Sequence, residues 1–172
     1  MTSADLLADT FERIHEIVAE VLDGLRPEDL TARLDDEANS IAWLIWHLTR
    51  VQDDHVAHVA GTEQAWMSAG WADRFALPLG TPDIGYGHDS AQVAAVSTGA
   101  DELRGYLDAV HENTLSFVRG LTDSDLDRVV DDRWDPPVTL GVRLVSVIAD
   151  DLQHAGQAAY VRGILQRRGA AF

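Results

Sequence analysis

The chain has 172 residues, a formal net charge of −16, no cysteine and no lysine. The acidic balance argues against nucleic acid and anionic membranes as partners, because both bind through clustered basic side chains. The composition also excludes disulfides, a thiol nucleophile of the protein's own and a Schiff-base lysine. The length suits one domain over residues 1–172. No apolar run approaches the ~18 residues of a transmembrane helix, and the acidic N-terminus does not resemble a signal peptide. We therefore expect a cytoplasmic protein.

Four long segments carry apolar residues at helical spacing. Pro27 ends the first segment. Asn39 or Ser40 can cap the N-terminus of the second, and Gly61 can end it. The helices are expected over residues 3–25, 39/40–60, 90–120 with a break at 98–99, and 139–169.

Two irregular segments separate these helices. The longer spans residues 61–89 and the other residues 133–137. Long loops in small domains are often functional. No segment shows a convincing period-2 alternation of a β-strand. We therefore predict an all-α four-helix bundle with a long loop between its second and third helices. Ligand sites in such bundles lie in the core, between facing helices.

A candidate site lies on the second and fourth helices. Asp150 and His154 are four residues apart, so both side chains leave one face of a helix, one turn apart. His47 borders the apolar stripe of the second helix and can face them. Two histidines and a carboxylate can hold one divalent metal, and three protein ligands leave a coordination position open for chemistry. Asp151 lies nearer the centre of the apolar stripe, where a carboxylate needs a partner.

The spacing leaves a plainer interpretation open. His47 and His154 can be buried, hydrogen-bonded histidines, while Asp150 and Asp151 are solvated or cap a helix. An Asp-x-x-x-His pair is a weak motif, far weaker than the His-Glu-x-x-His motif of zinc proteases. The residues alone therefore do not decide between a metal site and a structural polar cluster.

Two stretches, residues 39–61 and 143–163, resemble the DinB-like superfamily of four-helix metalloproteins. Its pattern has a histidine on the second helix, a His-x-x-x-His-x-Gly-Gln motif on the last helix and an arginine soon after. The matching residues here are His47, Asp150, His154, Gly156, Gln157 and Arg162. Asp150 departs from the pattern, since most members carry histidine there. The mycothiol-dependent maleylpyruvate isomerases similarly carry a carboxylate, a glutamate, at this position.

The resemblance implies a divalent metal, zinc or nickel, held by His47, Asp150 and His154. It also implies a low-molecular-weight thiol as cosubstrate, which explains a site without cysteine. A metal deprotonates the thiol it binds, and the thiolate is the nucleophile. The exclusive use of arginine suggests a GC-rich genome, which favours mycothiol over bacillithiol. No protein side chain is assigned as the nucleophile.

The predicted function is a metal-dependent thiol S-transferase that joins mycothiol to an electrophilic small molecule. One alternative is a mycothiol-dependent isomerase of the maleylpyruvate type. Another is a non-catalytic bundle that binds metal or acts in a stress response as a dimer. Metal content of the purified protein distinguishes an enzyme from a degenerate site.

Further residues are candidates for binding the substrates. Arg143 and Arg162 can bind a carboxylate, with a surface ion pair as the alternative. Gln157 can orient a ligand, and His58 can line the mouth of the pocket. A homodimer is expected because four tryptophans offer more aromatic surface than one small bundle needs. They are Trp43, Trp46, Trp66 and Trp71.

Overall fold

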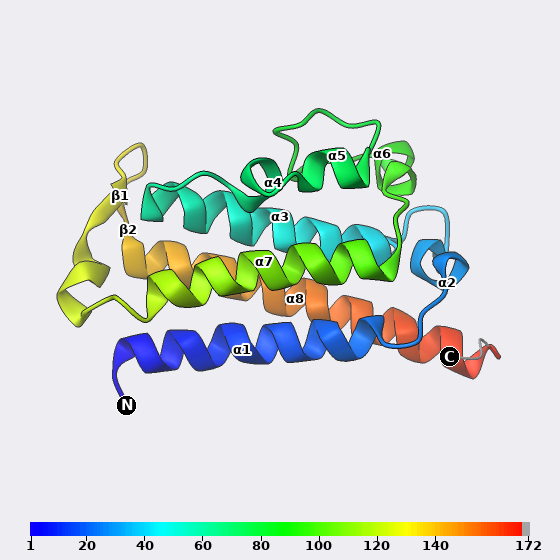
Figure 1. Ribbon diagram of the computed structural model, residues 1–172, viewed down its shortest axis with the longest axis horizontal. Helices are drawn as coiled ribbons and strands as arrows, with labels where there is room; N and C mark the ends of the chain where they lie inside the picture. Colours follow the sequence, from blue (N-terminus) through cyan, green and yellow to red (C-terminus); the bar gives the residue numbers. More distant parts are fainter. Residues whose placement is uncertain (170–172) are drawn as a thin grey trace.

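Four long helices lie side by side and form a bundle in the computed structural model, which describes residues 1–169 (Figure 1). They are α1 (Ser3–Leu22), α3 (Ile41–Ala60), α7 (Ala100–Val118) and α8 (Leu140–Arg167). Both α3 and α1 pack against α7 and α8, so the bundle is closed on four sides. This arrangement confirms the predicted four-helix bundle.

The ends of the long helices follow from their capping residues. The Ser40 hydroxyl accepts a hydrogen bond from the amide of Trp43 at 3.2 Å and starts α3. Gly61 ends α3 in the left-handed conformation, with φ of 70°. Thr139 caps α8 in the same way as Ser40 caps α3. The first helix ends at Leu22, before the predicted residue 25, because the chain turns through a positive φ at Gly24.

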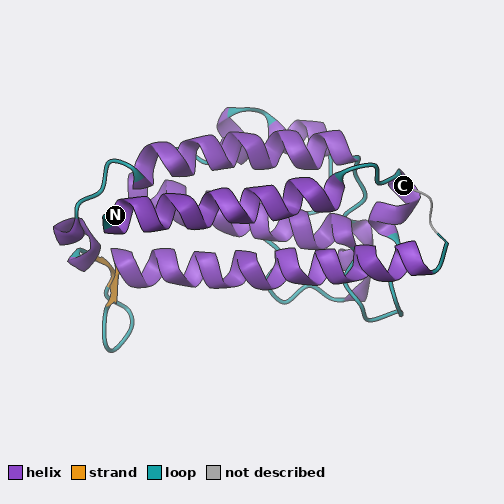
Figure 2. Cartoon of the chain, turned by 90° about the horizontal axis from the view of Figure 1, so that it is seen from below, coloured by secondary structure: helices purple, strands orange, loops and turns teal. Residues whose placement is uncertain are grey.

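Shorter elements connect the four helices. They are α2 (Pro27–Thr31), α4 (Ala65–Ser68), α5 (Trp71–Phe75), α6 (Ser90–Ala95), a 3-10 helix η1 (Asp123–Asp127), β1 (Val129–Asp131) and β2 (Val138–Thr139). The two strands pair antiparallel at one end of the bundle, where Figure 2 shows them in orange. The prediction of a fold without strands is therefore wrong at this end of the bundle. Strands of three and two residues are too short to show a period-2 pattern. The break between α6 and α7 falls at residues 96–99, as predicted.

The segment between α3 and α6 covers the outer face of α3. Its helices α4 and α5 lie over α3 and α7 in Figure 1. As a result α3 is buried on nearly all sides, including polar positions. The four tryptophans expected at a dimer surface, Trp43, Trp46, Trp66 and Trp71, are all buried. The expectation that these side chains form an exposed aromatic surface is therefore wrong, because they are buried within the chain itself, and the homodimer stays an untested prediction. No helix in the described part of the chain is both long and apolar enough to span a bilayer.

Candidate metal centre

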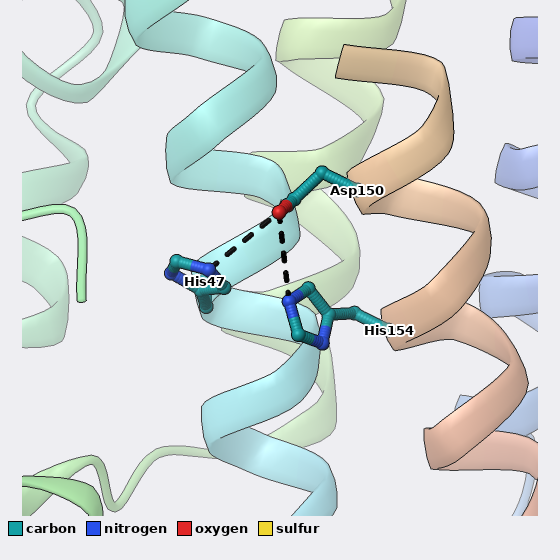
Figure 3. Close-up of side chains that lie close together, drawn as sticks. All are labelled: His47, Asp150 and His154. Carbon is teal, nitrogen blue, oxygen red and sulfur yellow. Dashed lines mark ion pairs between the residues drawn. The ribbon is translucent and has the colours of Figure 1, made fainter. Parts of the chain in front are cut away.

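The packing of α3 against α8 brings three potential metal ligands together, as Figure 3 shows. His47 comes from α3, and Asp150 and His154 come from successive turns of α8. One ligand atom of each residue lies within 4.8 Å of the other two. The Nε2 atom of His47 lies 3.9 Å from Asp150 Oδ2, and that of His154 lies 3.7 Å from Asp150 Oδ1. The structure thus places the three residues singled out in the sequence around one point.

Hydrogen bonds fix the ring orientation of His47 and His154 and determine which nitrogen of each ring carries the proton. The Nδ1 atom of His47 bonds the backbone carbonyl of Ile84. A carbonyl only accepts, so Nδ1 carries the proton and Nε2 keeps its lone pair. His154 Nδ1 likewise donates to Gln157 Oε1 at 2.9 Å. Metal-binding histidines typically hold their second nitrogen to a carbonyl or carboxylate in this manner. Both Nε2 lone pairs are consequently directed toward Asp150.

The electrostatics of the triad suit a cation. Burial lowers the pKa of His47 below its ordinary value, more than its bond to Ile84 raises it, so the ring favours its neutral, ligating form. Asp150 Oδ2 is buried and has no hydrogen-bond partner among the described residues. A buried carboxylate oxygen without a partner is costly. A divalent ion would satisfy this oxygen and the two imidazole lone pairs at once, so the donor set fits the expected metal.

A turn over residues 83–88 holds the Ile84 carbonyl in place. Asp83 accepts hydrogen bonds from the amide of Gly85 at 2.8 Å and from His88 Nε2 at 3.0 Å. The indole of Trp43 donates to His88 Nδ1 at 3.0 Å, which fixes the proton of His88 on the nitrogen that faces Asp83. The turn is therefore tied both to itself and to α3.

Glycine is required within this turn. Gly85 has a φ of 97°, and a Cβ built there would lie 2.6 Å from His47 Nδ1. Tyr86 follows and packs edge-on against the His47 ring, with centroids 5.3 Å apart. The hydrogen bond between His47 and the Ile84 carbonyl could not be found from the sequence, because a backbone carbonyl carries no side-chain signal. The sequence offers one sign of the turn, which is the pair of glycines, Gly85 and Gly87, beside Tyr86 and His88.

Asp151 points away from the triad into the core. Its side chain is fully buried and neither carboxylate oxygen has a hydrogen-bond partner among the described residues. Burial, together with the charge of Asp150, raises its pKa well above the ordinary value. The predicted helix register, with Asp150 rather than Asp151 beside the histidines, matches the geometry.

The four candidate substrate-binding residues lie in different places. Gln157 bonds His154, as described above. Arg143 donates to His55 Nδ1 at 3.0 Å and pairs with Asp131 at 3.3 Å. Together with His58 these residues line a cavity of about 620 Å³ between α3, α8 and β1. Arg143 precedes Asp150 by two helical turns, so this cavity lies about 10 Å along α8 from the triad, and none of the three triad residues lines it.

Arg162 is not brought to the triad. Its Nη1 atom donates to the backbone carbonyls of Val21 and Asp23, each at 2.6 Å. These carbonyls are at the C-terminal end of α1, where a cation is favourable. The structure therefore shows this arginine holding α8 to α1, and its contact with a substrate stays a prediction.

The bundle and its His/His/carboxylate cluster define the class of DinB-like helical proteins. More specifically, the family model for mycothiol S-transferases matches residues 6–167, and the chain belongs to that family. A solved structure of a conserved protein from Enterococcus faecalis is 32% identical, with a TM-score of 0.88. That match covers 94% of this chain and 96% of the other. No functionally curated protein matches the chain.

Proposed function

We propose that this protein is a metal-dependent thiol S-transferase, with His47, Asp150 and His154 holding one divalent ion, zinc or nickel. The observation that carries the proposal is the convergence of three ligand atoms around a buried Asp150 oxygen that has no hydrogen-bond partner in the part of the chain that the structure describes. Membership of the mycothiol S-transferase family supports mycothiol as the thiol cosubstrate.

The residues of the chain prepare the site for this reaction. An ion held by His47, Asp150 and His154 would act as a Lewis acid and would favour the thiolate form of the cosubstrate. Ile84 and Gln157 keep the imidazole lone pairs directed inward. The thiol proton passes to solvent, a sulfur–carbon bond forms, and the leaving group departs with its electron pair. The chain has no cysteine, so no protein thiol competes with the cosubstrate.

We further propose that the cavity lined by Arg143 and His58, two helical turns from Asp150, receives part of one of the two substrates. Arg143 and His58 line it, and Arg143 is held in a fixed position by Asp131 and His55. A guanidinium held in this way can bind a carboxylate or a hydroxyl of the substrate without first losing side-chain entropy. Gln157 acts on the reaction through His154, as a positioning residue.

We keep an isomerase of the maleylpyruvate type as a second candidate, because Asp150 is a carboxylate at the motif position where those isomerases carry a glutamate. In that reaction the thiolate adds to a cis double bond, rotation follows, and the thiol leaves unchanged. The two reactions are separated by stoichiometry. A transferase consumes one thiol for each electrophile, and an isomerase consumes none.

The test is thiol conjugation by the zinc- or nickel-loaded protein with mycothiol and a generic alkylating electrophile. We expect about one ion per chain, and loss of transfer on chelation with the helical circular dichroism signal intact, because apolar packing holds the bundle. His47→Ala should abolish transfer, while His111→Ala, on α7 and stacked against His15, should not. Transfer that survives chelation, or unfolding on chelation, would contradict the proposal. A metal-bound protein without transfer would favour the non-catalytic alternative.

A further inference from the structure

One tyrosine beside the triad has a hydroxyl group that the fold does not use. Tyr86 packs edge-on against the His47 ring, with the ring centroids 5.3 Å apart and the ring planes at 82°. The residue is nevertheless 59% exposed, and its hydroxyl makes no hydrogen bond to another described residue. An aromatic ring that is anchored at a candidate metal site, with its polar end open to solvent, is well placed to contact a ligand.

The backbone holds this side chain in one place. Gly85 and Gly87, on either side of Tyr86, have φ of 97° and 74°, so the chain reverses tightly and presents the ring between them. The same turn is tied to α3 through the indole of Trp43, which also stacks on the His47 ring with centroids 4.6 Å apart. The turn that orients His47 therefore also positions Tyr86, and little entropy remains to be lost when a ligand meets its hydroxyl.

The charged groups around the phenol are mostly hydrogen-bond acceptors. Burial raises the pKa of Tyr86 above its ordinary value, and three nearby carboxylates raise it further. They are Asp150, Asp151 and Asp54. The nearby cation, Arg143, is already engaged by its own partners. Tyr86 thus stays protonated at neutral pH and offers an uncommitted hydrogen-bond donor beside the triad.

We propose that the Tyr86 hydroxyl donates a hydrogen bond to the electrophile, at an oxygen that gains negative charge as the sulfur–carbon bond forms. This inference rests on the proposed function and names the substrate class, which is an α,β-unsaturated carbonyl compound. A donor in a fixed position stabilises charge that develops on an acceptor without having to reorganise. The thiolate is a poorer partner for the phenol, because sulfur is a weak acceptor.

The reaction of this class of electrophile balances without a leaving group. The thiolate sulfur forms a bond to the β carbon, and the π bond between the α and β carbons breaks. Its electron pair moves toward the carbonyl oxygen, to which Tyr86 donates its hydrogen bond while keeping its proton. The α carbon then takes a proton from solvent, which replaces the proton that the thiol released. Thiol and electrophile are joined one to one, with no oxidant or reductant.

The first test compares two electrophiles on the zinc-loaded protein with mycothiol. Benzylideneacetone is a conjugated ketone, and benzyl bromide carries a similar phenyl group but no oxygen. Tyr86→Phe keeps the ring against His47 and removes only the hydroxyl. It should lower kcat/KM for the ketone more than ~10-fold and for the bromide less than ~2-fold, because only the ketone develops charge on an oxygen. Tyr160→Phe is the matched control, since Tyr160 is equally exposed on α8, and it should change neither.

The second test measures binding instead of turnover. In the cobalt-loaded protein, the absorption band of a cobalt–thiolate bond reports the affinity for mycothiol, and competition with a chelator reports the affinity for cobalt. Both affinities should be the same in the wild type and in Tyr86→Phe. A loss of either affinity would overturn the proposal, because Tyr86 would then support the thiol or His47 instead of the electrophile.

The rates divide the remaining outcomes. Equal losses for the ketone and the bromide in Tyr86→Phe, or no loss for either, would overturn the role of Tyr86 alone. A wild type that transfers mycothiol to the bromide and not to the ketone would overturn the substrate class. A wild type that transfers mycothiol to neither electrophile would overturn the proposed function and this role with it.

Discussion

Helix α3 contributes to two buried polar clusters that differ in how their hydrogen bonds are satisfied. In the first, which we call the anchor cluster, Arg50 donates to the Gln64 side chain at 2.9 Å and to Tyr106 at 3.1 Å. Asp53 accepts from Tyr106 and from the amides of Ala65 and Trp66, all at 2.8–2.9 Å. The anchor cluster therefore joins most of its donors to acceptors within the protein, with Arg50 Nη2 as the exception, since it has no hydrogen-bond partner among the described residues.

The second cluster is the triad of His47, Asp150 and His154. His47 precedes Arg50 by three residues on α3, and the other two residues come from α8. Here the inward-facing atoms are all acceptors, two imidazole lone pairs and a carboxylate. Nothing within the triad donates to them. The comparison teaches that a buried polar cluster rich in both donors and acceptors holds the fold, whereas a cluster of converging acceptors is completed by a cation.

The two clusters are joined through one turn. Arg50 also donates to the backbone carbonyl of Asp83 at 3.2 Å, and the next carbonyl, that of Ile84, accepts from His47. The anchor cluster therefore fixes the backbone that orients the first ligand of the triad. Substitutions in each cluster should separate effects on metal binding from effects on stability.

The largest expected effect on metal binding comes from Asp150→Ala. Removing one of three ligands should weaken binding of zinc more than ~100-fold, since even outer partners of ligands contribute 10–100-fold. The free energy of unfolding of the metal-free protein should hardly fall, because Asp150 Oδ2 has no hydrogen-bond partner to lose among the described residues. Competition with a chelator of known affinity and urea denaturation measure the two quantities. Unchanged zinc affinity would show that Asp150 is not a ligand.

The largest expected effect on stability comes from Asp53→Ala in the anchor cluster. The substitution leaves the fully buried Arg50 without its carboxylate and two amides of α4 without an acceptor. Breaking a buried ion pair on one side costs about 3–5 kcal/mol. Urea denaturation should show this loss in the metal-free protein. The neighbouring Asp54→Ala is the control, because Asp54 is only half-buried and should cost less than about 1 kcal/mol. Equal effects of both substitutions would contradict the role of the anchor cluster.

A smaller effect should follow from Gly85→Ala at the turn between the clusters. The added methyl group would lie 2.6 Å from His47 Nδ1 and displace either the ring or the Ile84 carbonyl. We expect a 10–100-fold loss of zinc affinity, the usual cost of disturbing an outer partner of a ligand. Gly87→Ala is a matched control, because it has a similar φ of 74° and no atom within 4 Å of the added Cβ. Equal losses in both variants would assign the effect to backbone strain alone.

Much of the fold was readable from the sequence because its signals are local. Apolar spacing predicted the four long helices, and Ser40 and Gly61 marked the ends of α3 correctly. The two short strands carried no such signal. The burial of the tryptophans was missed because it depends on where the segment between α3 and α6 folds, which is a tertiary property.

The candidate ligand side chains could be predicted from the sequence, but the backbone contact that orients His47 could not. The i,i+4 spacing put Asp150 and His154 on one face of a helix, and the place of His47 at the edge of the apolar stripe on the second helix made it the third candidate, which the family resemblance supported. The Ile84 carbonyl could not be predicted, because any residue type offers the same backbone atom. Arg162 fits the family pattern by position, yet its side chain bonds the end of α1. A motif fixes where a residue lies on a helix and not which neighbour it meets.

The effect of a single pH unit on stability is smaller, and it concerns Asp151, which is fully buried outside both clusters. Burial raises its pKa in the folded protein, so the folded state binds a proton more tightly than the unfolded state, where the ordinary value is 3.8. Stability from this group is therefore greatest below pH ~4 and is lost as pH rises. The loss is at most ~1.4 kcal/mol for each pH unit above that value, up to the folded pKa.

Asp151→Asn keeps the shape of the side chain and removes this titration. The asparagine variant should match the wild type near pH 4 and exceed it in stability at neutral pH. Urea denaturation of the metal-free proteins from pH 4 to pH 8 measures the difference and avoids any contribution from the ligands. If the wild type instead gains stability relative to the variant as pH rises, Asp151 must be charged and paired in the folded protein. Its oxygens would then have donors in the folded protein, and the contrast between Asp151 and the hydrogen-bonded carboxylate of Asp53 would have to be redrawn.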